Sequence, residues 1–183
     1  MSAIAKRLAC LAFLLLSFAA LATADTEPYR VTSLLVPLTR YADRARMTAA
    51  LVVQVVDGDT VKVEIDEPPR GLGRRETVRL IGVDTPESVD RRKEVERFAR
   101  EASGLTKDRL LGARVRLAFD RELRDRYGRL LAYVFLEDGS CFDLELIAGG
   151  YGYAYVKYPF FFIDEFRNAE LAARYGKKGL WGW

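Results

Sequence analysis

The sequence of 183 residues contains no histidine and only two cysteines, Cys10 and Cys141. Without histidine, the chain lacks the most frequent general base of enzymes and the most frequent ligand of transition metals. Two cysteines are too few for a cysteine-rich zinc site or a disulfide framework. Any catalysis must therefore depend on carboxylates, guanidinium groups, tyrosines and a hard cation.

Long hydrophobic runs are also scarce, and the one that could approach a membrane span lies at the N-terminus. It extends from Leu8 to Leu21, follows Lys6 and Arg7, and leads into small residues that end at Ala24. This order is typical of a secretory signal. We therefore expect residues 1–24 to be cleaved and the protein to be exported, to the periplasm or the medium. The alternative is an uncleaved anchor, because the run falls just short of the about 20 residues of a membrane span.

A large excess of charge of one sign is lacking as well. Without residues 1–24, 27 basic and 26 acidic residues remain, so the total charge does not indicate a nucleic-acid partner. The basic residues nevertheless cluster, at 91–93 and in a second group that contains Arg121, Arg124, Arg126 and Arg129. Local patches of this kind can attract a polyanion although the total charge is close to zero.

Residue periodicity indicates one domain at 49–183, preceded by an extension at 25–48 without clear periodicity. Runs rich in Val, Ile and Thr predict three strands, at 51–56, 60–65 and 76–83, and a fourth and fifth strand are expected at 114–119 and 130–136, separated by a polar, Arg-rich loop. Apolar residues at spacings of three and four predict a long helix between 92 and 111, and shorter helices are expected at 142–148 and 162–175. The predicted fold is α+β and mainly β, a five-stranded OB-type barrel with about three packed helices. An SH3-like barrel is the alternative, although its strands need no long helix between the third and fourth.

Four short motifs carry the chemistry of the chain. They are Asp-Gly-Asp-Thr at 57–60, Arg-Leu-Ile-Gly-Val-Asp-Thr-Pro-Glu at 79–87, Glu-Ala-Ser at 101–103 and Asp-Arg-Tyr-Gly-Arg at 125–129. Each motif alone is weak, since an Asp-Gly-Asp-Thr segment is commonly no more than a hairpin turn. Together they contain the groups that hydrolysis of a phosphodiester needs.

The carboxylates and arginines of these motifs suit distinct steps. Asp59 and Asp84 are hard oxygen donors at two strand ends, which suits Ca²⁺ because this cation takes several oxygens in irregular geometry. Arg79 and Arg129 can hold phosphate oxygens through planar guanidinium groups and stabilise charge that develops at phosphorus. In a chain without histidine, Glu87 is the natural general base for the attacking water.

The four motifs, in this order, resemble those of the staphylococcal nuclease (thermonuclease) family over residues 51–181. The resemblance implies that Ca²⁺ binds to Asp59, Asp84 and the backbone carbonyl of Thr85, and that the catalytic residues are Arg79, Glu87 and Arg129. It also implies that Arg126 and Tyr127 contact a nucleotide phosphate and that Tyr155 contacts the nucleotide. We therefore expect an exported calcium-dependent nuclease, acting on DNA and RNA with single strands favoured and leaving 3′-phosphate ends. We also expect a monomer without a stable protein partner, and without membrane contact once the signal is removed.

An aromatic stretch at 151–162 contains four tyrosines followed by Phe160, Phe161 and Phe162. We expect the phenylalanines to fill the core, because consecutive large apolar residues rarely remain exposed without a partner. The tyrosines could instead stack on bases.

Two other functions compete with the nuclease. An OB barrel can bind nucleic acid or protein without catalysis, although such a module would be free to lose the carboxylates that this chain retains. A membrane-tethered structural protein is suggested by the N-terminal run alone and explains none of the four motifs.

Overall fold

A computed structural model of the chain describes residues 47–86 and 93–182. The predicted signal, most of the predicted extension and Glu87 lie outside these residues. The elements follow in the order β1 (Thr48–Val55), β2 (Thr60–Glu64), β3 (Arg75–Leu80), β4 (Val83–Asp84), α2 (Lys93–Leu110), β5 (Arg114–Ala118), β6 (Leu130–Phe135), α3 (Phe142–Ala148), β7 (Tyr153–Ala154), α4 (Ile163–Tyr175) and the 3₁₀ helix η4 (Gly179–Trp181).

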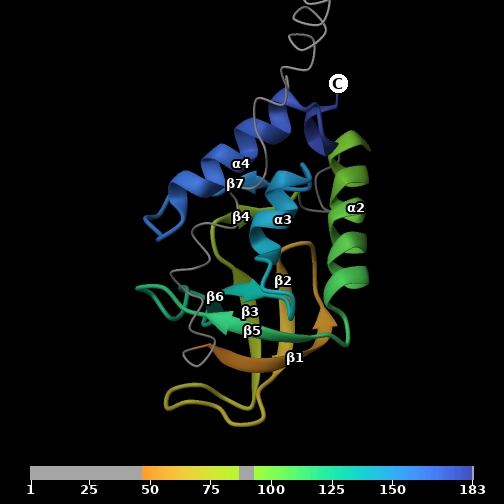
Figure 1. The fold of residues 1–183 in the computed structure, drawn as a ribbon. Helices are drawn as coiled ribbons and strands as arrows, with labels where there is room; N and C mark the ends of the chain where they lie inside the picture. The colour runs from red at the N-terminus through yellow and green to blue at the C-terminus, as the bar shows by residue number, and fades with distance from the viewer. Residues whose placement is uncertain (1–46, 87–92, 183) are drawn as a thin grey trace, which may run out of the picture. The chain divides into compact units, whose positions relative to one another are not determined.

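Five strands close into a barrel in the order β1-β2-β3-β6-β5 (Figure 1). Four of the pairings are antiparallel, between β1 and β2, β2 and β3, β1 and β5, and β5 and β6. The fifth pairing, between β3 and β6, is parallel and places Val78 beside Leu130. The predicted α+β fold, a five-stranded OB-type barrel with packed helices, is thereby confirmed, and the described residues contain three α-helices.

The predicted third strand at 76–83 is interrupted. The barrel strand β3 ends at Leu80, and the chain turns at Ile81 and Gly82 before β4, which pairs with β7 outside the barrel. Gly82 has a φ of +73°, and a Cβ at this position would lie 2.7 Å from the ring of Phe160. A residue with a side chain is therefore strained here both by conformation and by lack of space.

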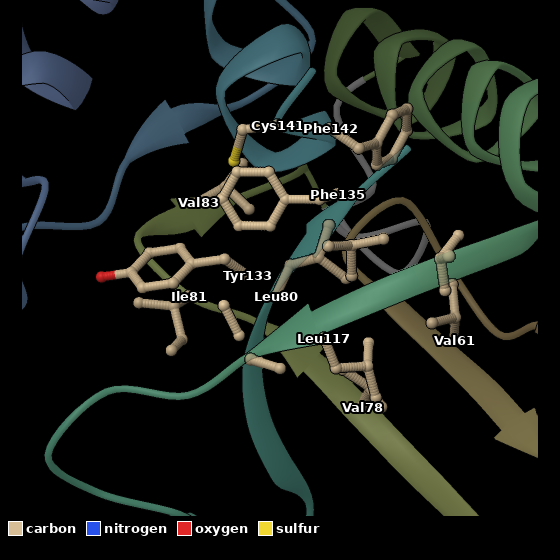
Figure 2. Close-up of a cluster of buried hydrophobic side chains, with 14 of the residues drawn as sticks. Val61, Val78, Leu80, Ile81, Val83, Leu117, Tyr133, Phe135, Cys141 and Phe142 are labelled. Atoms are coloured by element: carbon tan, nitrogen blue, oxygen red, sulfur yellow. The ribbon is translucent and has the colours of Figure 1, made fainter. Parts of the chain in front are cut away.

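The barrel interior is filled by alternate residues of the strands, as expected where successive side chains point to opposite faces. Figure 2 shows part of this core, with the buried side chains Val61, Val78, Leu80, Leu117, Phe135 and Phe142. Complete burial of each large apolar side chain contributes about 1.5–3 kcal/mol to the free energy of unfolding. The hydroxyl of Tyr133 points away from the labelled cluster, although its ring is fully buried (Figure 2).

The helices pack against the rest of the domain through buried faces of helical period. Phe98, Ala102 and Thr106 of α2 are buried, and Phe166, Ala169 and Ala173 of α4 form a second buried stripe. α3 lies between the barrel and α4 (Figure 1). None of the helices in the described part of the chain combines the length and apolar character of a membrane span.

Candidate active site

The turn between β1 and β2 buries the carboxylate of Asp59. Its Oδ2 accepts hydrogen bonds from the backbone N–H and the hydroxyl of Thr85, at 2.8 and 2.9 Å. Its Oδ1 accepts a hydrogen bond from the Thr60 hydroxyl at 3.2 Å, and its own N–H donates to Oδ1 of Asp57 at 3.1 Å. The position of this carboxylate is therefore fixed from two segments of the chain, 57–60 and 85.

Two further contacts hold this turn against the body of the protein. The hydroxyl of Thr106, a buried residue of α2, donates to the carbonyl of Gly58 at 2.7 Å and to that of Ala102 at 2.9 Å. A Cβ at Gly58 would lie 2.7 Å from Oγ1 of Thr85, so the turn and Thr85 approach more closely than a side chain permits. The second position of the Asp-Gly-Asp motif thus requires glycine for lack of space.

Arg79 of β3 lies between the two carboxylates that are predicted to bind the metal. Its Nη2 is 3.2 Å from Oδ2 of Asp59 and 2.8 Å from Oδ1 of Asp84. Its Nη1 donates to the carbonyls of Leu80 and Val83, at 3.1 and 2.7 Å. The turn at residues 81 and 82 makes these contacts possible, because it folds the chain back toward the arginine.

The electrostatics of Asp59 follow from its burial. Burial raises the pKa of Asp59 to about 6, although the positive charge of Arg79 and the hydrogen bond from the Thr85 N–H lower it. The negative charge of Asp57 adds to the increase. The charged form of this carboxylate is therefore only partly compensated by Arg79, and a further cation would stabilise it.

Arg129 is held by a compact turn that precedes β6. Its Nε donates to Oδ2 of Asp125 at 2.7 Å, and Oδ1 of Asp125 accepts the backbone N–H groups of Tyr127 and Arg129, both at 2.9 Å. Burial raises the pKa of Asp125, but these hydrogen bonds outweigh burial and leave the pKa below its ordinary value. Asp125 is not among the predicted site residues, although an aspartate at the start of a turn is a signal for such backbone contacts.

One cavity of about 770 Å³ brings the predicted site residues together. Eight of the nine line it, namely Asp59, Arg79, Asp84, Thr85, Arg126, Tyr127, Arg129 and Tyr155. The ninth, Glu87, lies outside the described residues. The parallel pairing of β3 with β6 explains how two motifs distant in sequence meet, since Arg129 directly precedes β6 and Arg79 lies in β3. The cavity also contains Asp57, Asp120 and Lys157, which were not predicted as site residues, together with Arg121 of the basic group and Tyr158 of the aromatic stretch.

The nucleotide-binding candidates lie at the exposed rim of this cavity. Tyr127 is 68% exposed, and the Cζ of Arg126 lies 4.7 Å from the centre of its ring. Tyr155 follows β7 directly, and its backbone N–H donates to the carbonyl of Gly82 at 2.8 Å. Its ring centre is 6.1 Å from that of Tyr158. The sequence offered no signal for the β4–β7 pair that places Tyr155 here, because two-residue strands show no period.

The three consecutive phenylalanines do not share one environment. Phe160 and Phe162 pack against the core, and the ring of Phe162 meets that of Tyr133 edge-on at 4.9 Å. Phe161 is 51% exposed, so the expectation of core filling is wrong for this residue. Its backbone N–H donates to Asp120 at 2.8 Å, which fixes the segment with its central ring directed outward.

The donor set of the site fits a hard cation such as Ca²⁺. The carboxylates of Asp59 and Asp84 both contact Nη2 of Arg79, so they lie close to one point. The predicted third ligand is the backbone carbonyl of Thr85, the residue that follows Asp84. Within residues 47–86 and 93–182, no three acidic, cysteine or histidine side chains are grouped to hold a metal ion. Two carboxylates with a carbonyl and water are nevertheless compatible with calcium, which accepts irregular oxygen coordination.

Comparisons with known proteins identify the family of the chain. A sequence profile of the family described as staphylococcal nuclease homologue matches residues 77–183. The thermonuclease of Staphylococcus intermedius is 43% identical over 114 residues, which are 62% of this chain and 64% of that protein. The thermonuclease of Staphylococcus hyicus is 37% identical over 131 residues, or 71% of this chain and 73% of that protein. Endonuclease YncB of Bacillus subtilis is 36% identical over 130 residues, or 70% of this chain and 59% of that protein.

The profile match covers more than half of the chain and contains all but one of the nine predicted site residues. The remaining one, Asp59, lies in the cavity with the others that the structure describes. The chain belongs to the staphylococcal nuclease family.

Proposed function

We propose that this member of the nuclease family is a calcium-dependent enzyme that hydrolyses phosphodiester bonds of DNA and RNA. We further propose that it favours single strands and leaves 3′-phosphate ends. The observation that carries the proposal is the joint presence of Asp59, Arg79, Asp84 and Arg129 in one cavity. A binding module without catalytic activity would not need two carboxylates converging on one arginine.

Asp59, Asp84 and the carbonyl of Thr85 are the residues that would hold the cation. Bound there, Ca²⁺ would offset negative charge on the phosphate and orient the attacking water. The hydrogen bonds from Thr85 and Thr60 keep the Asp59 carboxylate in one orientation. The site thus needs little rearrangement of the aspartate before it binds.

The two arginines would bind the phosphate and stabilise the charge of the five-coordinate transition state. Arg79 is anchored through Nη1 to two carbonyls, and Arg129 is anchored through Nε to Asp125. Anchored donors lose little freedom when the transition state forms, and this makes their stabilisation effective. Glu87 would accept the proton of the attacking water while the bond from phosphorus to the 5′-oxygen breaks.

Digestion assays test this proposal. Single-stranded DNA, duplex DNA and RNA are incubated with calcium and, separately, with excess chelator. We expect cleavage with calcium, most rapid for single strands, and none with chelator. Asp59→Asn should abolish cleavage, whereas the matched control Asp164→Asn, an exposed position on α4, should not change it. Full activity in excess chelator would overturn the calcium mechanism, and binding without any cleavage would favour the silent OB module.

We also propose that the protein acts after export, in the periplasm or the medium, as a monomer without a stable protein partner. The basic, apolar and small residues of 1–24 support export. N-terminal sequencing of the exported protein tests this proposal, since cleavage after Ala24 is expected. An exported protein that retains Met1 would instead support the membrane anchor.

A further inference from the structure

Two large aromatic rings are exposed beside the cavity. Tyr158 is 57% exposed and Phe161 is 51% exposed, and both belong to the segment between β7 and α4. A single exposed aromatic ring is ordinary on a protein surface, but two that lie close together in the chain beside a cavity form a patch, and such patches mark interaction sites.

The position of Phe161 is set by the barrel core. Oδ2 of Asp120 accepts hydrogen bonds from the Phe161 backbone N–H at 2.8 Å and from the Tyr133 hydroxyl at 2.7 Å. The ring of Tyr133 is fully buried, and it packs edge-on against Phe162, the residue that follows Phe161. Asp120 lies in the loop between β5 and β6. It therefore connects this loop to the segment that contains Phe161, and both are held to the same core residue, Tyr133.

This connection places a cation beside each exposed ring. Arg121 follows Asp120, and its Cζ lies 5.5 Å from the centre of the Phe161 ring. The Nζ of Lys157 lies 5.7 Å from the centre of the Tyr158 ring. Each pair combines an apolar face with a positive charge, and a nucleotide presents the complementary combination of a base and a phosphate.

These pairs continue the surface of the active site. Arg121, Lys157 and Tyr158 line the same cavity as Arg79 and Arg129. A strand whose phosphate lies at the two arginines can therefore extend over Tyr158 within the cavity, and Phe161 directly follows Phe160, another residue of the cavity wall. Because a base must be unstacked from its neighbours to lie on a side-chain ring, this surface suits a single strand and not a duplex.

We propose that Arg121 with Phe161 and Lys157 with Tyr158 form a second nucleotide-binding site, the outer platform, for the part of a single strand beyond the cleaved bond. This inference rests on the proposed nuclease function, and it adds that substrate affinity depends on the length of the oligonucleotide. Oligonucleotides that reach the outer platform bind more tightly than those that occupy only the region of Arg79 and Arg129.

Binding of fluorescent oligothymidylates of two and eight nucleotides tests the outer platform. Dissociation constants of the full chain are measured by anisotropy in excess chelator. The wild-type protein should bind the longer oligomer more tightly. Phe161→Ala should weaken binding of the longer oligomer by about tenfold, as expected for loss of one stacked base, and leave the shorter one unchanged. Tyr175→Ala, which removes a ring that is 76% exposed at the other end of α4, is the matched control and should change neither.

A second variant tests the charge of Arg121 while the Phe161 ring stays in place. Arg121→Gln keeps the Phe161 ring but removes the charge, so it should weaken the longer oligomer and reduce the salt dependence of its binding by about one ion. Equal affinity of the wild-type protein for both lengths would overturn the outer platform. So would a preference for the longer oligomer, the length effect, that is unchanged in both variants. Calcium-dependent cleavage by the wild-type protein is measured in parallel. If cleavage occurs while the length effect persists in the variants, only the outer platform is wrong; if cleavage is absent, the proposed function itself fails.

Discussion

The inner end of the cavity and its rim are built in different ways. At the inner end, Asp59 and Arg79 are largely buried and each makes several short polar contacts with neighbouring segments. At the rim, Tyr127, Tyr158 and Phe161 expose half or more of their surface and have cations beside their rings. Fixed donors suit stabilisation of a transition state, and exposed rings suit binding of varied bases. Changes at the inner end should therefore lower kcat, and changes at the rim should raise KM.

The largest effect is expected for Arg79→Lys or Arg129→Lys. Lysine keeps the charge but loses the planar set of donors, so kcat should fall by about 100-fold or more while the fold persists. Steady-state kinetics and circular dichroism measure both quantities. Arg167→Lys, an exposed position on α4, serves as the control. Near-normal turnover in both variants would show that these arginines act only through general electrostatic attraction of the substrate. The inner end of the cavity would then not differ from the rim in its effect on kcat.

A smaller effect at the inner end is expected for Thr106→Val. This change removes the hydroxyl that binds the Gly58 carbonyl and leaves a buried acceptor without its donor, at a cost of about 1–3 kcal/mol in the free energy of unfolding. Because the turn also carries Asp59, we expect kcat to fall by about tenfold, since small misplacements of a catalytic group are costly. Thr106→Ser retains the hydroxyl and should restore kcat. If the serine variant is as slow as the valine variant, Thr106 acts through packing alone.

At the rim, Tyr127→Phe and Tyr155→Ala should raise KM several-fold with a smaller change in kcat. The Tyr127 hydroxyl accepts a hydrogen bond from Arg126 at 2.6 Å, so its loss also frees the arginine from one fixed position. Glu87→Gln should show the opposite pattern, a lower kcat with little change in KM. If Tyr155→Ala instead lowered the melting temperature and left KM unchanged, Tyr155 would belong to the core.

The smallest effect on catalysis is expected for Asp143→Asn, which lies in neither region. Asp143 of α3 is fully buried, its Oδ2 accepts the Val134 N–H at 2.8 Å, and burial raises its pKa to about 8. The folded protein therefore retains a proton that the unfolded chain releases above the ordinary pKa of 3.8. It follows that this residue makes the protein less stable as the pH rises from about 4 to about 8. Urea unfolding at pH 5 and pH 8.5 should show a smaller loss of stability in the asparagine variant than in the wild-type protein, and an equal loss in both would contradict the raised pKa.

The sequence predicts the barrel strands well because each is a short local segment of largely apolar, β-branched or aromatic residues bounded by turns. It predicts the inner end of the cavity because short motifs carry those residues. It does not show that the third strand is interrupted, since residues 76–83 have the composition of one continuous strand. The close approach of Gly82 to Phe160, which requires the turn there, joins residues far apart in the chain. The rim is also hidden from the sequence. Contacts such as that between Asp120 and Phe161 join residues far apart in the chain, and the local composition of an aromatic stretch does not tell which ring is exposed.

The parallel pairing of β3 with β6 has a consequence for the way the protein gains activity. The antiparallel pairs β1–β2 and β2–β3 join neighbouring segments and can hold Asp59 and Arg79 early, because short loops close at low entropic cost. Val78 and Leu130 are about 50 residues apart in the sequence, so their pairing closes a long loop and is among the slower steps of folding. Arg129 reaches the cavity only with that step. During refolding, a chain with a native-like hairpin but an open barrel would be compact and inactive. The recovery of nuclease activity would therefore measure the closure of the barrel.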